Sequence, residues 1–192
     1  AVQVAHALGI HGSAPEFDYF TAVDDLAEDG EETGAGMIGT VQMMSSTLYR
    51  FATVNVAGLG KNLESEENAK QAAIQFVDAF IKSMPTGKIN TFANHTLPEL
   101  VYVTVRDTRP VSLVTAFEEP VQATDAKNLR RAGAEALAQE EKEFEESYGL
   151  KPQAAFVVGV SEAREPFADI AESVTLPELT ERLGAALESS QS

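Results

Sequence analysis

The alternating pattern of Leu100 to Arg106 constrains the fold more than any other feature of the sequence. Valines occupy every second position of this segment, and between them lie Leu100, Tyr102, Thr104 and Arg106. Successive side chains of a strand point to opposite faces of a sheet, so the segment predicts a strand with one aliphatic and one mixed face. Thr47 to Val56 has a similar pattern, at the end of an extended segment that begins at Thr40. Such strands suit a sheet with helices on one face, whose other face is either open to a ligand or also covered.

Two further segments predict strands. Val2 to Leu8 alternates and predicts a short strand, and the unbroken apolar run of Ala154 to Val160 predicts a buried one. Arg50 falls on the aliphatic side of its own segment, which predicts a bulge or a sheet edge at that position.

Helical patterns separate these strands. After Ser65, a good N-cap, apolar residues recur at helical spacing up to Pro85, and this helix is predicted to pack on the aliphatic face of the sheet. The last helix opens with the capping box Thr175-Leu176-Pro177-Glu178. Its inward stripe is predicted to be Leu179, Leu183 and Leu187.

A longer helix is predicted from about Asp125 to Tyr148, with Gly149 as its C-terminal cap. Its predicted inner stripe consists of Leu129, Gly133, Leu137, Phe144 and Tyr148. The acidic residues of Glu140 to Glu146 are then interpreted as a solvated outer face. The order of strands and helices predicts an α+β fold with a largely antiparallel sheet.

Three aromatic residues gather in the stretch Phe17 to Asp25, directly before paired carboxylates. The turn signal of Gly12 to Pro15 before it and the acidic, glycine-rich Glu28 to Gly36 after it predict a projecting hairpin. Alternation places Phe20 on one face and the other two aromatic residues on the opposite face, where they are expected to brace the hairpin against the domain. The cluster either fills a satellite core or forms a contact surface for a partner such as stacked bases.

The bulk charge opposes binding of nucleic acid. The chain carries 30 acidic and 14 basic side chains, a formal charge of −16, and phosphate binding depends on lysine and arginine. Much of the acid is local, in Glu28 to Glu32 and Glu140 to Glu146, so the remaining surface can still carry a basic stripe. The chain begins at Ala1 without an initiator methionine, and we expect an N-terminal half to be missing from it.

Motifs for catalysis are few, and no catalytic residue is assigned. The sequence has no cysteine, which excludes disulfides, thiol nucleophiles and thiolate metal sites. Its three histidines lack the spacing of a zinc site, so neither a metal nor another cofactor is expected. Asp24 and Asp25, with Glu28 and Asp29 near them, leave a metal-dependent hydrolase as a weaker alternative. Apolar runs are shorter than the roughly 20 residues that a bilayer requires, so a cytoplasmic protein that binds no membrane is expected.

A polar loop from Thr86 to Phe92 is predicted between a helix and the Leu100 strand. Lys88, Asn90 and Thr91 gather there around a glycine turn. Backbone amides of such a loop can bind a phosphate oxygen while Lys88 supplies positive charge. Alternatively, the polar groups of the loop satisfy only their own backbone.

The stretch from His6 to Leu59 carries two blocks, HALGIHGSAPEFDYFTAVDDL and IGTVQMMSSTLYRFATVNVAGL, joined by the acidic segment. A third block from Gly87 to Val121 is GKINTFANHTLPELVYVTVRDTRPVSLVTAFEEPV. Together they resemble the later half of the CasC-type backbone subunit of the type I-E CRISPR Cascade complex. The resemblance implies an RNA-recognition-like (ferredoxin-like) palm over residues 1–192, incomplete at its N-terminus, with a thumb hairpin inserted at residues 12–45.

The resemblance also implies a non-enzymatic function in antiviral defence. Several copies would form a filament along a guide RNA (crRNA), together with other Cascade subunits, and hold the guide ready to pair with target DNA. The expected RNA contacts are Phe20, Thr21 and Val23 in the thumb and Lys88, Asn90 and Thr91 in the loop. Two alternatives stay open: a protein interaction module without direct RNA contact, and the acidic metal-dependent hydrolase.

Overall fold

A computed structural model describes residues 1–22, 37–124 and 128–189 of the chain. The strands are β1 (Val2–Val4), β2 (Leu8–Gly9), β3 (Glu16–Ala22), β4 (Met37–Met43), β5 (Leu48–Tyr49), β6 (Ala52–Val54), β7 (Leu100–Val105), β8 (Ala154–Gly159) and β9 (Glu172–Ser173). The α-helices are α1 (Val56–Leu63), α2 (Glu66–Lys82), α3 (Ile89–Phe92), α4 (Leu129–Tyr148) and α5 (Leu176–Ser189). Two 3-10 helices are η1 (Val114–Phe117) and η2 (Ser161–Phe167). The fold is therefore mixed α+β, as predicted.

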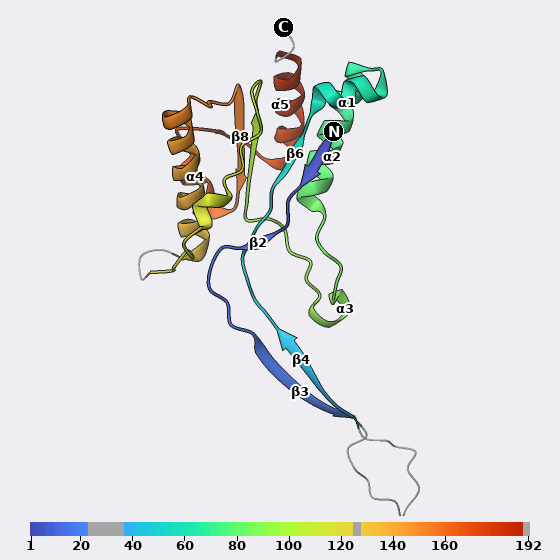
Figure 1. Ribbon diagram of the computed structural model, residues 1–192, viewed down its shortest axis with the longest axis vertical. Coiled ribbons are helices and arrows are strands. Elements are labelled where there is room, and N and C mark those ends of the chain that lie inside the picture. The colour runs from blue at the N-terminus through green and yellow to red at the C-terminus, as the bar shows by residue number, and fades with distance from the viewer. Residues whose placement is uncertain (23–36, 125–127, 190–192) are drawn as a thin grey trace, which may run out of the picture.

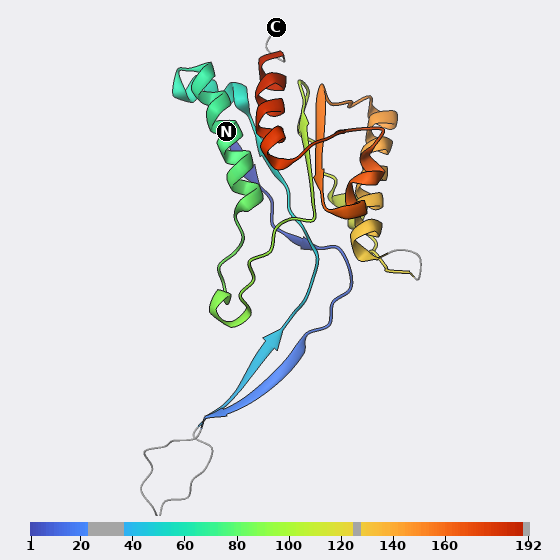
Figure 2. The same ribbon diagram turned by 180° about the vertical axis from the view of Figure 1, so that it is seen from behind.

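The strand pairing is largely antiparallel, which was also predicted. β1 pairs with β6, β2 with β5, β3 with β4 and β7 with β8, all in antiparallel orientation, while β8 and β9 are parallel. Among the described strands, β7, β8 and β9 form a sheet of three, and the other pairs form sheets of two. Figures 1 and 2 show β3 and β4 as a long hairpin that extends away from a body built of all the other elements.

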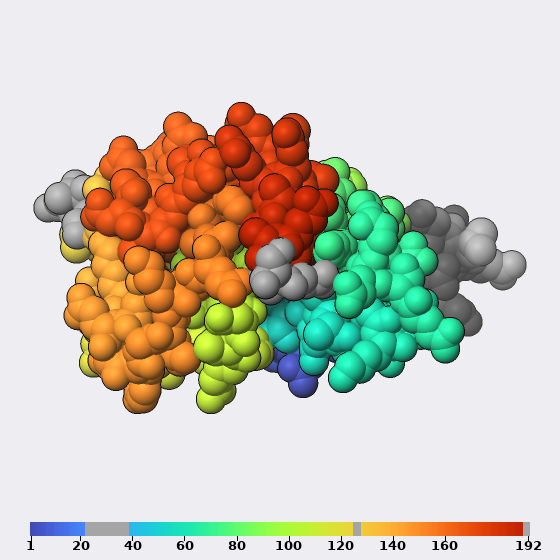
Figure 3. All heavy atoms as spheres, turned by 90° about the horizontal axis from the view of Figure 1, so that it is seen from above, coloured from blue at the N-terminus to red at the C-terminus, as the bar shows by residue number. Residues whose placement is uncertain are grey.

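The sheet of β7 and β8 is covered on both faces, so the open face considered from its sequence is not present. One face packs on α2 and α5 through Val105, Phe156, Ala73, Leu179 and Leu183. The other face packs on α4 and η2 through Tyr102, Val157, Ala138 and Phe167. Seen from above in Figure 3, α4 lies at one side of the body and α1 and α2 lie at the other. Bases therefore have no exposed sheet surface here on which to stack.

Both capped helices begin where their sequences predicted. The Ser65 hydroxyl accepts a hydrogen bond from the Asn68 N–H at 3.2 Å and caps α2. At the start of α5, the Thr175 N–H donates to the Glu178 carboxylate at 2.8 Å, which confirms the capping box. The predicted inner stripe of α5 is also confirmed, because Leu179, Leu183 and Leu187 are all buried.

The buried face of α4 agrees with its predicted stripe only in part. Gly149 caps the helix with φ at 66°, as predicted, but Tyr148 is 70% exposed. Gly133 of the predicted stripe is buried and Leu137 packs partly buried against the core, but the other buried residues are Ala134, Ala138 and Glu141. Small residues let α4 approach the body closely, and a Cβ at Gly133 would lie 2.9 Å from Cδ1 of Ile10. The predicted start at Asp125 lies outside the described residues, and Asn128 is the N-cap of the described helix.

A buried ion pair replaces part of the solvated acidic face that we expected on α4. Glu141 is only 1% exposed and pairs with Arg106, whose side chain is 7% exposed. Arg106 also donates to the Leu150 carbonyl. Burial raises the pKa of Glu141, while the charge of Arg106 and the Tyr102 hydroxyl oppose this effect. The prediction failed at Glu141 because the local sequence of α4 does not show that Arg106, far away in the chain, lies opposite this carboxylate in the folded protein.

The extended segment predicted from Thr40 to Val56 is interrupted. Its residues form β4, β5 and β6, and Arg50, where a bulge or an edge was predicted, lies in the gap between β5 and β6. The segment ends earlier than predicted because Asn55 caps α1, accepting a hydrogen bond from the Gly58 N–H at 2.7 Å. Val2 to Leu8 is likewise divided between β1 and β2.

Candidate nucleic-acid interface

The hairpin of β3 and β4 has two chemically different faces. In an antiparallel pair, directly opposed residues share a face. One face carries Phe17 opposite Gln42 and Tyr19 opposite Thr40, together with Thr21. The other face carries Glu16 opposite Met43, Asp18 opposite Val41, and Phe20 opposite Gly39. We call the first the Tyr19 face and the second the Phe20 face. The two acidic residues of β3 both lie on the Phe20 face, so the Tyr19 face offers aromatic and uncharged polar groups.

The aromatic residues of the hairpin differ in exposure. Tyr19 is 73% exposed, Phe17 is 57% exposed and Phe20 is 47% exposed. Phe20 lies directly over Gly39, because a Cβ built on Gly39 would lie 2.3 Å from Cζ of the Phe20 ring. The expectation that Phe17 and Tyr19 brace the hairpin against the domain is wrong. Their partners across the strand are polar, and the hairpin points away from the body in Figures 1 and 2.

Hydrogen bonds join the two chains at the root of the hairpin. The Ile10 N–H donates to the Thr47 carbonyl at 3.0 Å, and the Thr47 N–H donates to Nε2 of His11 at 3.0 Å. Because Nε2 accepts this bond, the proton of the neutral imidazole is assigned to Nδ1, which donates to the Gly12 carbonyl at 2.8 Å. His11 thus holds the two chains of the root together with both of its ring nitrogens.

The loop that was predicted from Thr86 to Phe92 contains the short helix α3, which lies at the same end of the body as the hairpin (Figure 1). Lys88 precedes this helix with φ at 60° and is exposed, and Asn90 and Thr91 are exposed within it. Several backbone N–H groups of the loop form hydrogen bonds with carbonyls of the same loop. The Ile89 N–H donates to the Thr86 carbonyl, and the Thr91 N–H donates to the Lys88 carbonyl. The Lys88 ammonium, in contrast, forms no ion pair within the described part of the chain.

Several other cations of the described chain are paired with carboxylates. Arg130 pairs with Glu99 at 2.6 Å, Arg131 with Glu165 at 2.6 Å, and Lys82 with Asp78 at 2.7 Å. The Arg130 guanidinium lowers the pKa of Glu99, as expected for an ion pair. Lys88 has no such carboxylate partner within the described residues, and it lies exposed beside polar side chains at the same end of the body as the hairpin.

The remaining candidate residues lie outside the described residues. Val23, the acidic positions Asp24, Asp25, Glu28 and Asp29, and the glycines of Gly34 to Gly36 all belong to 23–36. Over the described ranges, no group of three or more histidine, aspartate or glutamate side chains is arranged to hold a metal ion. No described helix has the length and hydropathy to span a membrane.

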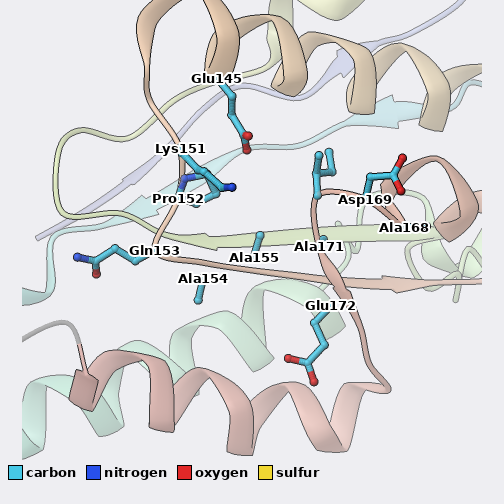
Figure 4. Close-up of a pocket in the computed structure, with 11 residues that line it drawn as sticks. Glu145, Lys151, Pro152, Gln153, Ala154, Ala155, Ala168, Asp169, Ala171 and Glu172 are labelled. Carbon is cyan, nitrogen blue, oxygen red and sulfur yellow. The ribbon is translucent and has the colours of Figure 1, made fainter.

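A shallow pocket lies near the C-terminal end of α4, at the end of the body away from the hairpin (Figures 1 and 4). Glu145, Asp169, Glu172 and Lys151 supply its charged side chains. Three carboxylates against one ammonium make this pocket unsuited to a phosphate. The nucleic-acid candidates of the described chain are thus the hairpin and the loop around Lys88.

Sequence reasoning identified the hairpin but missed the Tyr19 face as its more exposed side. The signal lay in the strand register, because Gln42 and Thr40 opposite Phe17 and Tyr19 mark that face as polar. Sequence alone could not provide this register, since residues 23–36 separate the two strands.

Comparison with known proteins gives consistent results. A family model described as "CT1975-like protein" matches residues 1–182. A solved structure titled "CRISPR RNA-guided surveillance complex" contains a chain that is 33% identical, with a TM-score of 0.84. The match covers 97% of the present chain and 70% of that chain.

A second structure, titled "CRISPR RNA-guided surveillance complex, pre-nicking", is also 33% identical, with a TM-score of 0.83. This match covers 97% of the present chain and 50% of that chain. No curated protein sequence matches the chain. The resemblance that the sequence blocks carried is confirmed by these matches.

Proposed function

Because the chain belongs to the CT1975-like protein family, we propose that it acts as a guide-RNA-binding backbone subunit of a type I-E CRISPR Cascade complex. The observation that carries this proposal is 33% identity over 97% of the chain to a subunit of a CRISPR RNA-guided surveillance complex. Identity at this level, together with a TM-score of 0.84, supports a common role as well as a common fold. The role of the whole protein is inferred, because the chain spans 70% of one relative and 50% of the other.

In this proposal the protein is non-enzymatic and works in the cytoplasm. Several copies form a filament along the crRNA, contact the other Cascade subunits, and hold the guide for pairing with target DNA. Residues 1–192 supply part of an RNA-recognition-like palm, and residues 12–45 form its thumb. The sheet of β7 and β8 has helices on both faces, so RNA contact falls to elements that extend from the body.

The proposed contacts use the chemistry of the two exposed elements. Phe20, Thr21 and Val23 of the thumb contact bases and sugars, and the exposed Phe17 and Tyr19, on the opposite face of the hairpin from Phe20, add further aromatic contacts. Aromatic rings stack on any base, so such contacts bind a guide of any sequence. In the loop, Lys88 contacts a phosphate, and the amide of Asn90 and the hydroxyl of Thr91 bind neighbouring phosphate or sugar oxygens.

Titration of purified protein with guide RNAs of unrelated sequence tests the proposal. Lys88→Ala should weaken binding about equally for every guide and lower the salt slope by roughly 0.7 to 1, because an ammonium on a phosphate contacts no base edge. Lys61→Ala is the matched control, since Lys61 is an exposed lysine of α1, at the end of the body away from the hairpin.

Two outcomes would contradict this proposal. If wild-type protein binds no guide RNA and purifies without nucleic acid, the chain is instead a protein interaction module with an aromatic docking hairpin. If Lys88→Ala and Lys61→Ala have identical effects, the loop is not a phosphate contact.

A further inference from the structure

Arg50 lies where the two exposed elements meet the body. It follows β5, which pairs with β2 at the root of the hairpin, and it precedes β6. Alternation along this segment would direct Arg50 to the aliphatic side, and the chain is not in a strand at this position. The side chain is half-buried although it forms no ion pair within the described residues. A half-buried guanidinium without a carboxylate needs other hydrogen-bonding partners.

Those partners lie at the C-terminal end of α2. Nη1 of Arg50 donates to the Ser83 carbonyl at 2.9 Å and lies 3.7 Å from Sδ of Met84. The guanidinium lies over the Phe80 ring, 4.3 Å from its centroid. Unpaired carbonyls and the helix dipole favour a cation at this end of a helix, and an aromatic face adds a cation–π interaction. Ser83 is also the residue at which the chain leaves α2 toward Lys88.

The neighbouring residue Tyr49 fixes the same segment to the other side of the body. The Tyr49 hydroxyl accepts a hydrogen bond from the Leu113 N–H at 3.1 Å, and its ring lies 5.4 Å from that of Phe117. Adjacent side chains therefore contact opposite sides of the body. The root of the hairpin is held between η1 on one side and the end of α2 on the other.

We propose that Arg50 is a positioning residue that sets the placement of the hairpin relative to the Lys88 loop, so that one RNA contacts both. The RNA part rests on the proposed function above. When two contacts are held in a fixed relation, the second forms at a high effective concentration once the first has formed. Without the Arg50 contacts, the hairpin takes a wider range of positions relative to the Lys88 loop, and RNA binding is weaker, although Arg50 itself does not contact the RNA.

A distance measurement tests the positioning without any RNA. The sequence has no cysteine, so Gln42→Cys in β4 and Thr86→Cys in the loop, both at exposed positions, give a single pair of spin labels. We expect a narrow distance distribution with Arg50 present and a broad one after Arg50→Ala. Phe80→Leu should also broaden it, since this variant removes the ring under the guanidinium without changing the charge. Lys61→Ala, which removes a cation elsewhere, should leave it narrow, and an unchanged distribution in both Arg50→Ala and Phe80→Leu would overturn the proposal.

RNA titration then separates positioning from direct contact. Arg50→Ala should lower affinity roughly tenfold, the scale of one lost hydrogen bond to a charged group, with the salt slope unchanged. Arg50→Lys should lose nearly as much, because an ammonium cannot lie flat on Phe80 and donate in the same geometry. A salt slope reduced by about 0.7 would show that Arg50 contacts a phosphate and would overturn the positioning role. Wild-type protein that binds no RNA would overturn the proposed function, while the spin-label result would still decide whether Arg50 holds the two elements.

Discussion

The body and the hairpin are built from similar alternating strands, but they use their side chains differently. In the body, alternate residues of β7 pack against helices on both faces of the sheet, and Val105 and Phe156 are buried. In the hairpin, Phe17, Tyr19 and Phe20 of β3 are all exposed, and residues of β4 lie opposite them across the strand pair. Alternation thus shows that a segment is a strand with two faces, but not whether either face is covered. Exposed aromatic residues on an extended hairpin are available to a partner, whereas the body sheet is not.

The largest effect on the body is expected from Glu141→Ala. This change leaves Arg106 buried without its carboxylate, which should lower the free energy of unfolding by about 3 to 5 kcal/mol. Chemical denaturation measures this loss. Glu143→Ala, an exposed carboxylate of the same helix, is the control and should change stability by less than about 0.5 kcal/mol.

A double variant makes the comparison sharper. Replacing both partners, with Glu141→Leu and Arg106→Met, should destabilise much less than Glu141→Ala, because no unpaired charge remains. If Glu141→Ala costs no more than the control, the body is more loosely packed at this position than the burial of Glu141 indicates.

The hairpin should respond in the opposite way. Phe20→Ala and Tyr19→Ala should each cost about 1 to 3 kcal/mol of RNA affinity, the scale of one base-stacking contact, with nearly unchanged thermal midpoints. Titrations and thermal melts of the same samples measure both quantities. Phe20 packs on Gly39 and has the lower exposure, so any loss of midpoint should be larger for Phe20→Ala than for Tyr19→Ala.

The core-filling interpretation makes a different prediction for the same variants. If Phe20 filled a core, Phe20→Ala would cost about 3 to 5 kcal/mol of stability and would impair binding only through unfolding. That result would show that the aromatic residues of the hairpin stabilise the fold as the buried residues of the body do.

The smallest effect concerns pH and the first turn of α5. Glu178 accepts hydrogen bonds from the N–H and the hydroxyl of Thr175. Both lower its pKa below the usual value of 4.5, and the N–H has the larger effect. When the pKa of a carboxyl group is lower in the folded state than in the unfolded state, its ionised form stabilises the fold at pH values above the unfolded-state pKa. This stabilisation is lost as the pH falls through the lower, folded-state pKa. The midpoint difference between wild type and Glu178→Ala should therefore be present at neutral pH and should shrink in acid.

RNA binding at neutral pH should be the same for wild type and Glu178→Ala, since α5 belongs to the body. A midpoint difference that persists or grows in acid would show that the capping carboxylate is not the cause.

Several parts of the fold were predictable because their signals are local. The N-cap of α2, the capping box of α5 and the glycine cap of α4 each depend on a few neighbouring residues, and the structure confirms all three. The helix α1 was missed because Gly58 and Gly60 give it poor helical propensity. At Gly60 a Cβ would lie 3.8 Å from that of Ala69 in α2, an ordinary contact distance, so the packing of α1 on α2 does not require glycine there.

Features that depend on distant residues could not be predicted. Glu141 and Arg106 lie 35 positions apart, and nothing near either residue indicates the other. The closed second face of the sheet depends on η2, whose residue Phe167 lies far along the chain from Tyr102. For the candidate site, the hairpin and the exposed Lys88 followed from sequence, but the β4 residues that share a face with Phe20 or with Tyr19 became clear only with the register.

The most direct test of the account is amide hydrogen exchange with and without a guide RNA. The account predicts slowed exchange in β3, β4 and the residues of α3, with little change in β7 and β8, whose sheet is covered by helices on both faces. Slowed exchange confined to the body sheet or to α4, with the hairpin unchanged, would contradict the claim that the extended elements bind the RNA.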